Sequence, residues 1–122
     1  MRKEVYVKIN PIPVADEKEG LNELKISVDY AKGGVNYFNG RSEKRGIYVY
    51  FTPVYRSGGI QRSIMLGGRK ESGFKAFVRE CGRMSQKQID SVFERVEGIK
   101  DKIAELYDKE AYQTIAALVM AA

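Results

Sequence analysis

Apolar and polar side chains alternate through the first half of the chain, in the period of two that places successive side chains on opposite faces of a β-strand. The alternation runs through residues 4–10, 21–31, 46–56 and 60–68. In the second segment Leu24, Ile26 and Val28 share one face. One long loop apart, short turns such as "RSGG" join the segments, so the pattern predicts a four-stranded antiparallel meander.

The period changes after residue 70. We expect a short helix over 72–81, which begins at Ser72 and ends before a Gly-Arg pair. Residues 85–110 carry apolar positions at a spacing of three and four behind Ser85 as the N-cap, which predicts one amphipathic helix. Gly98 lies inside this helix at a cost of about 1 kcal/mol relative to Ala. The last segment, 110–122, is helical by propensity.

A meander followed by helices predicts the α+β class. We expect a single domain over 1–122, in which an N-terminal antiparallel sheet within 1–68 is packed on one face by C-terminal helices within 72–121. Tyr48 and Tyr50 alternate with the apolar positions of their strand. We therefore expect these two rings on the face of the sheet that the helices leave open.

The amino-acid composition limits the possible function mainly by excluding several kinds of catalytic and metal site. The chain holds 21 Lys and Arg against 16 Asp and Glu, a net charge of +5 that favours anionic partners. It has one cysteine and no histidine, so the common nucleophile–base pairs and most zinc or iron sites are excluded. We expect a protein that is not an enzyme and has no cofactor, no bound metal and no catalytic residues.

Two further observations concern location. The first residues alternate instead of forming a signal peptide, and the apolar tail "TIAALVMAA" is too short to span a bilayer. A cytoplasmic protein with no membrane partner is therefore expected. Because this tail has more apolar surface than one small sheet needs, we also expect it to be a subunit contact in a homo-oligomer.

The loop 31–46, "AKGGVNYFNGRSEKRG", carries the strongest candidate chemistry. Its glycines let the backbone approach a ligand, its adjacent rings offer stacking faces, and its cations suit phosphate. The residues that we expect to bind ligand here are Asn36, Tyr37, Phe38 and Arg45. A long hairpin whose aromatic side chains fold back on the sheet explains the same loop without a ligand.

Two other connections place glycines and cations before a predicted helix N-terminus, where free backbone N–H groups favour anions. One is "GGRKESGF" at 67–74, with Arg69, and the other is "GRMSQKQ" at 82–88, with Arg83, Ser85 and Lys87. Plain connections with solvated cations remain an alternative for both. A ligand with a base and phosphates would explain all three connections together.

The runs "KGGVNYFNGRSEKRGIYVYFTPV" and "GFKAFVRECGRMS", with a strand between them and a terminal helix after them, have a familiar order. Over nearly all of the chain they resemble the first-described family of phage-encoded Thoeris anti-defence proteins. The resemblance implies a sponge that binds glycocyclic ADP-ribose signals and withholds them from the defence effector without cleaving them. It also implies a separate site for the cyclic trinucleotides of CBASS defence, assembly as dimers and hexamers, and a sheet followed by helices.

The resemblance further implies ligand contacts at Phe74 and in the run 82–85, which contains Arg83, Met84 and Ser85. Met84 stands where a polar amide is more usual in relatives. Two other classes of protein fit the same sequence. One is a single-stranded nucleic-acid-binding protein of PC4, Whirly or Pur-type architecture, which would use its tyrosines and positive charge. The other is a purely structural phage or mobile-element protein.

Overall fold

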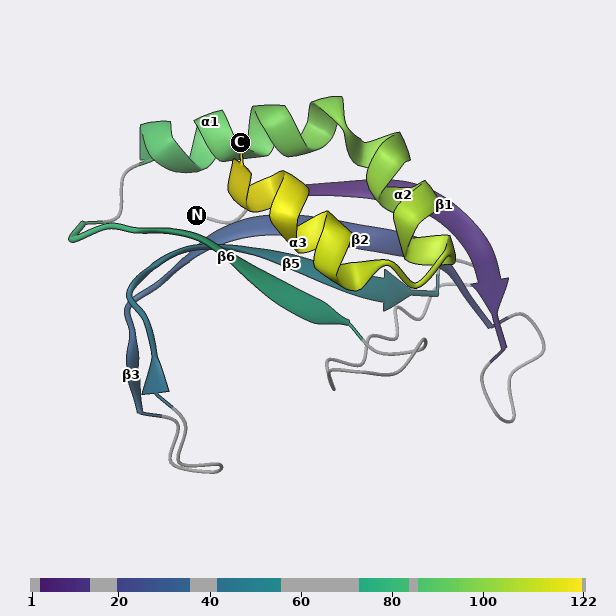
Figure 1. The fold of residues 1–122 in the computed structure, drawn as a ribbon, viewed down its shortest axis with the longest axis horizontal. Helices are drawn as coiled ribbons and strands as arrows, with labels where there is room; N and C mark the ends of the chain where they lie inside the picture. Colours follow the sequence, from purple (N-terminus) through teal and green to yellow (C-terminus); the bar gives the residue numbers. More distant parts are fainter. Residues whose placement is uncertain (1–2, 14–19, 36–41, 56–72, 84–85, 122) are drawn as a thin grey trace.

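The computed structural model of this chain describes residues 3–13, 20–35, 42–55, 73–83 and 86–121. Its main sheet has four antiparallel strands in the spatial order β1-β2-β5-β6: β1 (Lys3–Ile12), β2 (Leu21–Ala31), β5 (Gly46–Val54) and β6 (Phe74–Glu80). A separate pair, β3 (Gly34–Val35) and β4 (Ser42–Glu43), lies between β2 and β5 in the chain. The helices α1 (Gln86–Gly98), α2 (Lys100–Asp108) and α3 (Tyr112–Ala121) follow and lie together on one face of the sheet (Figure 1).

The core lies between this sheet face and the helices, as the alternation predicts. In β2 the side chains of Leu24, Ile26 and Val28 are fully buried, and in β5 so are Ile47, Val49 and Phe51. The helices contribute buried residues at helical spacing: Ile89, Val92, Val96, Ile103, Tyr107, Ile115 and Val119. The α+β class and the antiparallel sheet packed by C-terminal helices are therefore confirmed.

The predicted short helix over 72–81 is wrong, because this segment is the edge strand β6. Phe74 and Ala76 pair with Phe51 and Val49 on the core side, whereas Lys75 pairs with Tyr50 on the other side. Alternating burial on a sheet outweighs the flanking Ser and Gly signals, since Phe and Val are good strand formers. The sheet therefore extends to residue 80. The strand predicted over 60–68 lies outside the described residues.

The amphipathic helix predicted over 85–110 is present but divided. α1 ends at Gly98, and Ile99 takes a non-helical backbone conformation (φ −117°, ψ 16°) before α2 begins. Glycine is the weakest helix former after proline, so the division falls where helical propensity is lowest. The break gives α2 a direction different from that of α1 and lets it pack against β1 (Figure 1). α3 confirms the predicted last helix.

Candidate functional site

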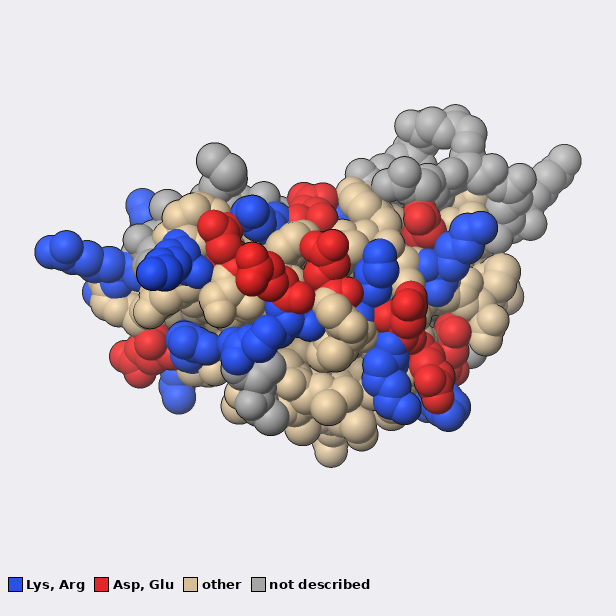
Figure 2. All heavy atoms as spheres, turned by 90° about the horizontal axis from the view of Figure 1, so that it is seen from above, with Lys and Arg blue, Asp and Glu red and all other residues tan. Residues whose placement is uncertain are grey.

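Two of the three connections singled out in the sequence meet at one end of the sheet. Gly46, the first residue of β5, pairs with Glu80, the last residue of β6. Arg45 therefore precedes β5 at the same sheet end at which Arg83 follows β6, shortly before α1 begins with Lys87 in its first turn. Figure 2 shows Lys and Arg side chains projecting from this end of the molecule. We call this end of the sheet the basic end.

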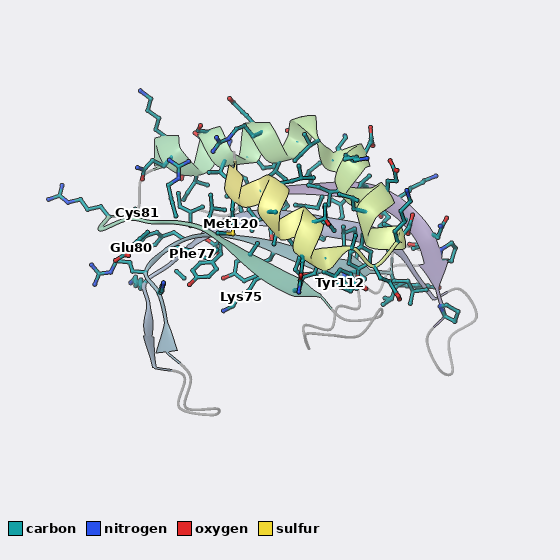
Figure 3. The ribbon with its side chains drawn as sticks, viewed as in Figure 1. Lys75, Phe77, Glu80, Cys81, Tyr112 and Met120 are labelled. Carbon is teal, nitrogen blue, oxygen red and sulfur yellow. The ribbon has the colours of Figure 1, made fainter. Side chains whose placement is uncertain are left out.

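Beside the basic end, a group of rings and lysines lies on the open face of the sheet. Tyr48 and Tyr50 of β5 pair with Phe77 and Lys75 of β6. The rings of Tyr48 and Phe77 meet edge to face with centroids 5.1 Å apart, and those of Tyr48 and Tyr50 are 6.3 Å apart. The helices lie on the opposite face of the sheet. The side chains of Lys75 and Phe77 extend from β6 on the face without helices (Figure 3).

Two lysine side chains are placed against these rings. Lys75 Nζ lies 5.2 Å from the Tyr48 ring centroid, and Lys44 Nζ lies 5.8 Å from that of Phe77. Both distances are within the range of cation–π attraction. The Tyr48 hydroxyl also donates a hydrogen bond of 2.8 Å to the Lys44 carbonyl oxygen. We refer to Lys44, Tyr48, Tyr50, Lys75 and Phe77 as the Tyr48 cluster.

The Tyr48 cluster combines the two chemical features that a nucleotide requires. Flat rings attract a base by stacking, and ammonium groups within a few ångströms attract phosphate. Tyr48 itself is 5% exposed, so its ring supports the cluster, whereas Tyr50 and Phe77 are only partly buried and Lys44 and Lys75 are exposed. The surface that these residues present is therefore formed by two partly exposed rings and two cations.

Phe74 apart, the expected ligand residues fall into two groups. Asn36, Tyr37, Phe38, Arg69, Met84 and Ser85 lie outside the described residues. Arg45, Arg83 and Lys87 are exposed at the basic end. The Arg45 Nε donates a hydrogen bond of 3.4 Å to the Lys32 carbonyl oxygen.

Phe74 lies in different surroundings. Its ring centroid is 4.6 Å from that of Phe51, 5.2 Å from that of Tyr112 and 6.4 Å from that of Tyr107. These contacts place Phe74 in an aromatic group between the sheet and helices α2 and α3. Phe74 also begins β6, whereas Gly82 and Arg83 follow the other end of this seven-residue strand, about 23 Å away. Within one chain the end of the 67–74 connection is thus separate from the basic end.

Sequence reasoning did not single out Lys75 and Phe77, because it placed them on a helix. The period of two in "FKAFVRE", with Lys75 and Phe77 on one face and Phe74 and Ala76 on the other, is the signal that finds them. Lys44 belongs to the loop that the sequence analysis treats as a phosphate contact. The contact of Lys44 with the Phe77 ring of β6 is seen only in the structure, because it depends on the pairing of β5 with β6.

The two carboxyl groups with a lowered pKa, those of Asp90 and Glu105, do not indicate a catalytic site. Gln86 and Lys3 hydrogen-bond to Asp90 and lower its pKa, and Lys109 and Lys102 lower the pKa of Glu105. Both carboxylates are on the helices, in ion pairs that favour the charged form over a proton-donating one. Within the described part of the chain, no group of three or more Cys, Asp and Glu side chains is placed to hold a metal ion.

Comparisons with known proteins leave the family open. No family model matches the chain, and no curated protein or solved structure matches it either. Among the described residues, none of the helices has the length and apolar character needed to cross a membrane.

Proposed function

We propose that the protein is a non-catalytic nucleotide-binding protein that sequesters a cyclic ADP-ribose isomer, with the Tyr48 cluster and the basic end as its binding surface. The observation that carries the proposal is the placement of Lys44 and Lys75 against Phe77 and Tyr48. Arg45 and Arg83 lie at the adjoining sheet end. In the context that the sequence resemblance implies, sequestration of a glycocyclic ADP-ribose would protect a phage from Thoeris defence.

The chemistry of such a ligand matches these residues. A cyclic ADP-ribose isomer carries one adenine and a pyrophosphate with two negative charges. Phe77 and Tyr50 offer ring faces to the adenine, and the side chains of Lys44, Lys75 and Arg45 offer charge to the pyrophosphate. Holding the ligand needs no general base, which agrees with a chain that contains no histidine.

The proposal is tested by titrating glycocyclic ADP-ribose into the protein in a calorimeter. We expect stoichiometric binding and recovery of the intact ligand after the protein is denatured. The double variant Lys44→Ala/Lys75→Ala should bind at least about tenfold more weakly, a loss of about 1.4 kcal/mol. The double variant Lys102→Ala/Lys109→Ala removes the same charge from α2 and its C-cap residue and should bind like the unaltered protein.

Three results would overturn the proposal. The first is the absence of binding by the folded protein, and the second is recovery of a cleaved ligand, which would indicate an enzyme. The third is equal weakening of affinity by the two double variants. That result would mean that the ligand senses only the net charge of the protein and not the Tyr48 cluster.

The open sheet face favours a second candidate function, binding of single-stranded nucleic acid. Tyr50 and Phe77 present partly exposed rings on two strands, supported by the buried ring of Tyr48, and no described helix covers this face. Stacking on such rings contributes about 1–3 kcal/mol per base. Labelled oligonucleotides should then bind with an affinity that falls steeply with salt and rises with strand length. Binding of the cyclic nucleotide without oligonucleotide affinity would rule this candidate out.

A further inference from the structure

Arg95 has a buried charge without a partner. It lies in the last turn of α1, and its Nε and Nη2 atoms are shielded from water and form no hydrogen bond. Within the described residues, Arg95 also forms no ion pair with an Asp or Glu side chain. Taking a guanidinium out of water is unfavourable unless an opposite charge or other acceptors replace the water. The two unpaired nitrogens therefore indicate a position suited to an anion.

This side chain lies on the inner flank of the helix layer. On α1, Asp90 and Phe93 contact Lys3 of the edge strand β1. Arg95 is about 140° and 200° away from these two residues around the helix, on the flank that turns from β1 towards α3. α1 packs on β1 and β2, α3 packs on β6, and the two helices share little direct contact on the same sheet face (Figure 1). We call the region between them the α1–α3 seam.

The α3 side of this seam is apolar. Figure 3 shows Met120 of α3 above β6, near the free edge of the sheet. Leu118 is about 200° away from Met120 around the helix and therefore lies on the flank towards α1. Leu118 is 38% exposed, one of two large apolar side chains among the described residues that the fold leaves exposed. A guanidinium on one helix thus faces an incompletely covered aliphatic side chain on the other.

The unpaired atoms of Arg95 select the shape of the anion. Nε and Nη2 form one edge of the guanidinium, and their N–H groups point in parallel directions. This edge matches the two oxygens of a carboxylate, each of which accepts one N–H. The match is bidentate, so it depends on the guanidinium plane and not only on positive charge.

The surroundings of Arg95 select the charge of the anion. The last turn of α1 contains no other basic residue, and Glu94 and Glu97 lie within two residues of Arg95. One cation balances one negative charge, and the two glutamates disfavour a second. The seam therefore suits a monoanionic carboxylate better than a phosphate dianion.

We propose that Arg95 binds the carboxylate of a small monoanionic acid whose apolar body contacts Leu118 in the α1–α3 seam. Because Nε and Nη2 are shielded, the ligand enters by displacing apolar cover, which the limited contact between α1 and α3 permits. The seam lies on the helix side of the sheet, whereas the Tyr48 cluster lies on the other face. The carboxylate site therefore stands or falls independently of the proposed nucleotide site.

Nuclear magnetic resonance tests the contact directly. The Nε–H signal of Arg95, identified by its loss in Arg95→Lys, should shift saturably when hexanoate is added. Acetate should bind at least about threefold more weakly, because it lacks the apolar body. Arg95→Lys keeps the charge but not the fork, and should lower hexanoate affinity at least about tenfold. Inorganic phosphate that shifts this signal at lower concentration than hexanoate would overturn the proposal.

Thermal melting tests the same site without assignment of the spectrum. Arg95→Met removes the unpaired charge and should melt at the same temperature as the unaltered protein or higher. Hexanoate should raise the melting temperature of the unaltered protein and of Lys102→Met, the matched control on α2, but not that of Arg95→Met. An equal rise in all three proteins would place the acid on another surface and overturn the proposal.

A pair of substitutions on α3 tests the apolar part of the site. Leu118→Ala should lower hexanoate affinity by about threefold or more and leave acetate affinity unchanged. Met120→Ala removes an equally apolar side chain from the opposite flank of the helix and should leave both affinities unchanged. A loss of hexanoate affinity in Met120→Ala and not in Leu118→Ala would contradict the assignment of the acid to the α1–α3 seam.

Discussion

Gly46 lies so close to Arg79 that no other residue fits at the start of β5. A Cβ built on Gly46 collides with the Arg79 carbonyl oxygen and lies 2.8 Å from Cε1 of Phe77. The backbone of Gly46 also has a positive φ of 158°. The absence of a side chain at Gly46 therefore lets β5 and β6 approach closely where the basic end meets the Tyr48 cluster.

Gly46→Ala should therefore destabilise the fold by about 1–3 kcal/mol, because both the close contact and the positive φ must be relieved. The free energy of unfolding in urea measures the effect. Gly98→Ala is the matched control, since a Cβ there meets nothing within 4 Å. Equal stability of the Gly46→Ala variant and the unaltered protein would show that the strands can separate at this point without cost.

The hydrogen bond from Tyr48 to the Lys44 carbonyl gives a second prediction. Tyr48→Phe keeps the ring against Phe77 but removes the hydroxyl donor, and we expect a loss of about 0.5–1.5 kcal/mol in the free energy of unfolding. Tyr30→Phe serves as the control, because within the described residues the hydrogen bond of Tyr30 is made by its backbone N–H and not by its hydroxyl. A Tyr48→Phe variant that is no less stable than the control would contradict a structural role for this bond.

The ion pair between Lys3 and Asp90 predicts a dependence of stability on acid. Lys3 Nζ lies 3.2 Å from Asp90 Oδ1, and Gln86 Nε2 donates to the same oxygen at 2.9 Å. Because these contacts lower the pKa of Asp90 in the folded protein, its contribution to stability is present above the ordinary carboxyl pKa and is lost as the pH falls through the folded-state value.

Asp90→Asn should therefore lower stability near neutral pH, and the difference from the unaltered protein should shrink in acid. Denaturant unfolding measured as a function of pH checks this expectation. Glu94→Gln removes a charge from the same helix as a control. Two stability curves that remain parallel down to strongly acidic pH would contradict the assignment.

Burial of Tyr112 predicts a loss of stability at alkaline pH, in contrast to the loss in acid that follows from Asp90. Its hydroxyl is buried without a hydrogen-bond partner within the described residues, and burial raises its pKa, with a smaller contribution from Glu110. The unfolded chain therefore ionises first as the pH rises, so stability is full below the ordinary tyrosine pKa and declines above it.

Tyr112→Phe should cost little stability at neutral pH, because it removes an unsatisfied polar group, and should reduce the alkaline decline. Thermal melting between neutral pH and pH values above the ordinary tyrosine pKa tests both effects. A large loss at neutral pH would reveal a hydrogen bond to this hydroxyl.

Most of the fold could be predicted from the sequence, because periodicity reports burial directly. Leu24, Ile26 and Val28 are fully buried, as their alternation predicts. The segment 74–80 could not be assigned in the same way. Its seven residues are too short for the two periods to differ clearly, and Ser72 and Gly82 resemble helix ends. The distinction depends on β5, a partner far away in sequence.

The candidate site could be predicted only in part. The sequence indicates that Arg45 and Arg83 lie in connections rich in glycine, but the pairing of Gly46 with Glu80 is needed to bring those connections together. The period of two in 74–80 can place Lys75 and Phe77 on one face, but the cation–π contacts of this face depend on the register of β6 with β5, which spacing does not give. Phe74 is partly buried and packs against the core, stacked on Phe51, a placement that its position beside a glycine-rich connection does not indicate.

The order of the elements along the chain has a consequence during protein synthesis. The strands leave the ribosome before the helices that cover them, and the apolar face formed by Leu24, Ile26 and Phe51 stays in contact with water until α1 follows. A nascent chain halted after β6 would carry a complete sheet with an exposed apolar face that is prone to aggregation. Chaperones that recognise exposed apolar strands should therefore engage this protein before translation of the helices is finished, and release it afterwards.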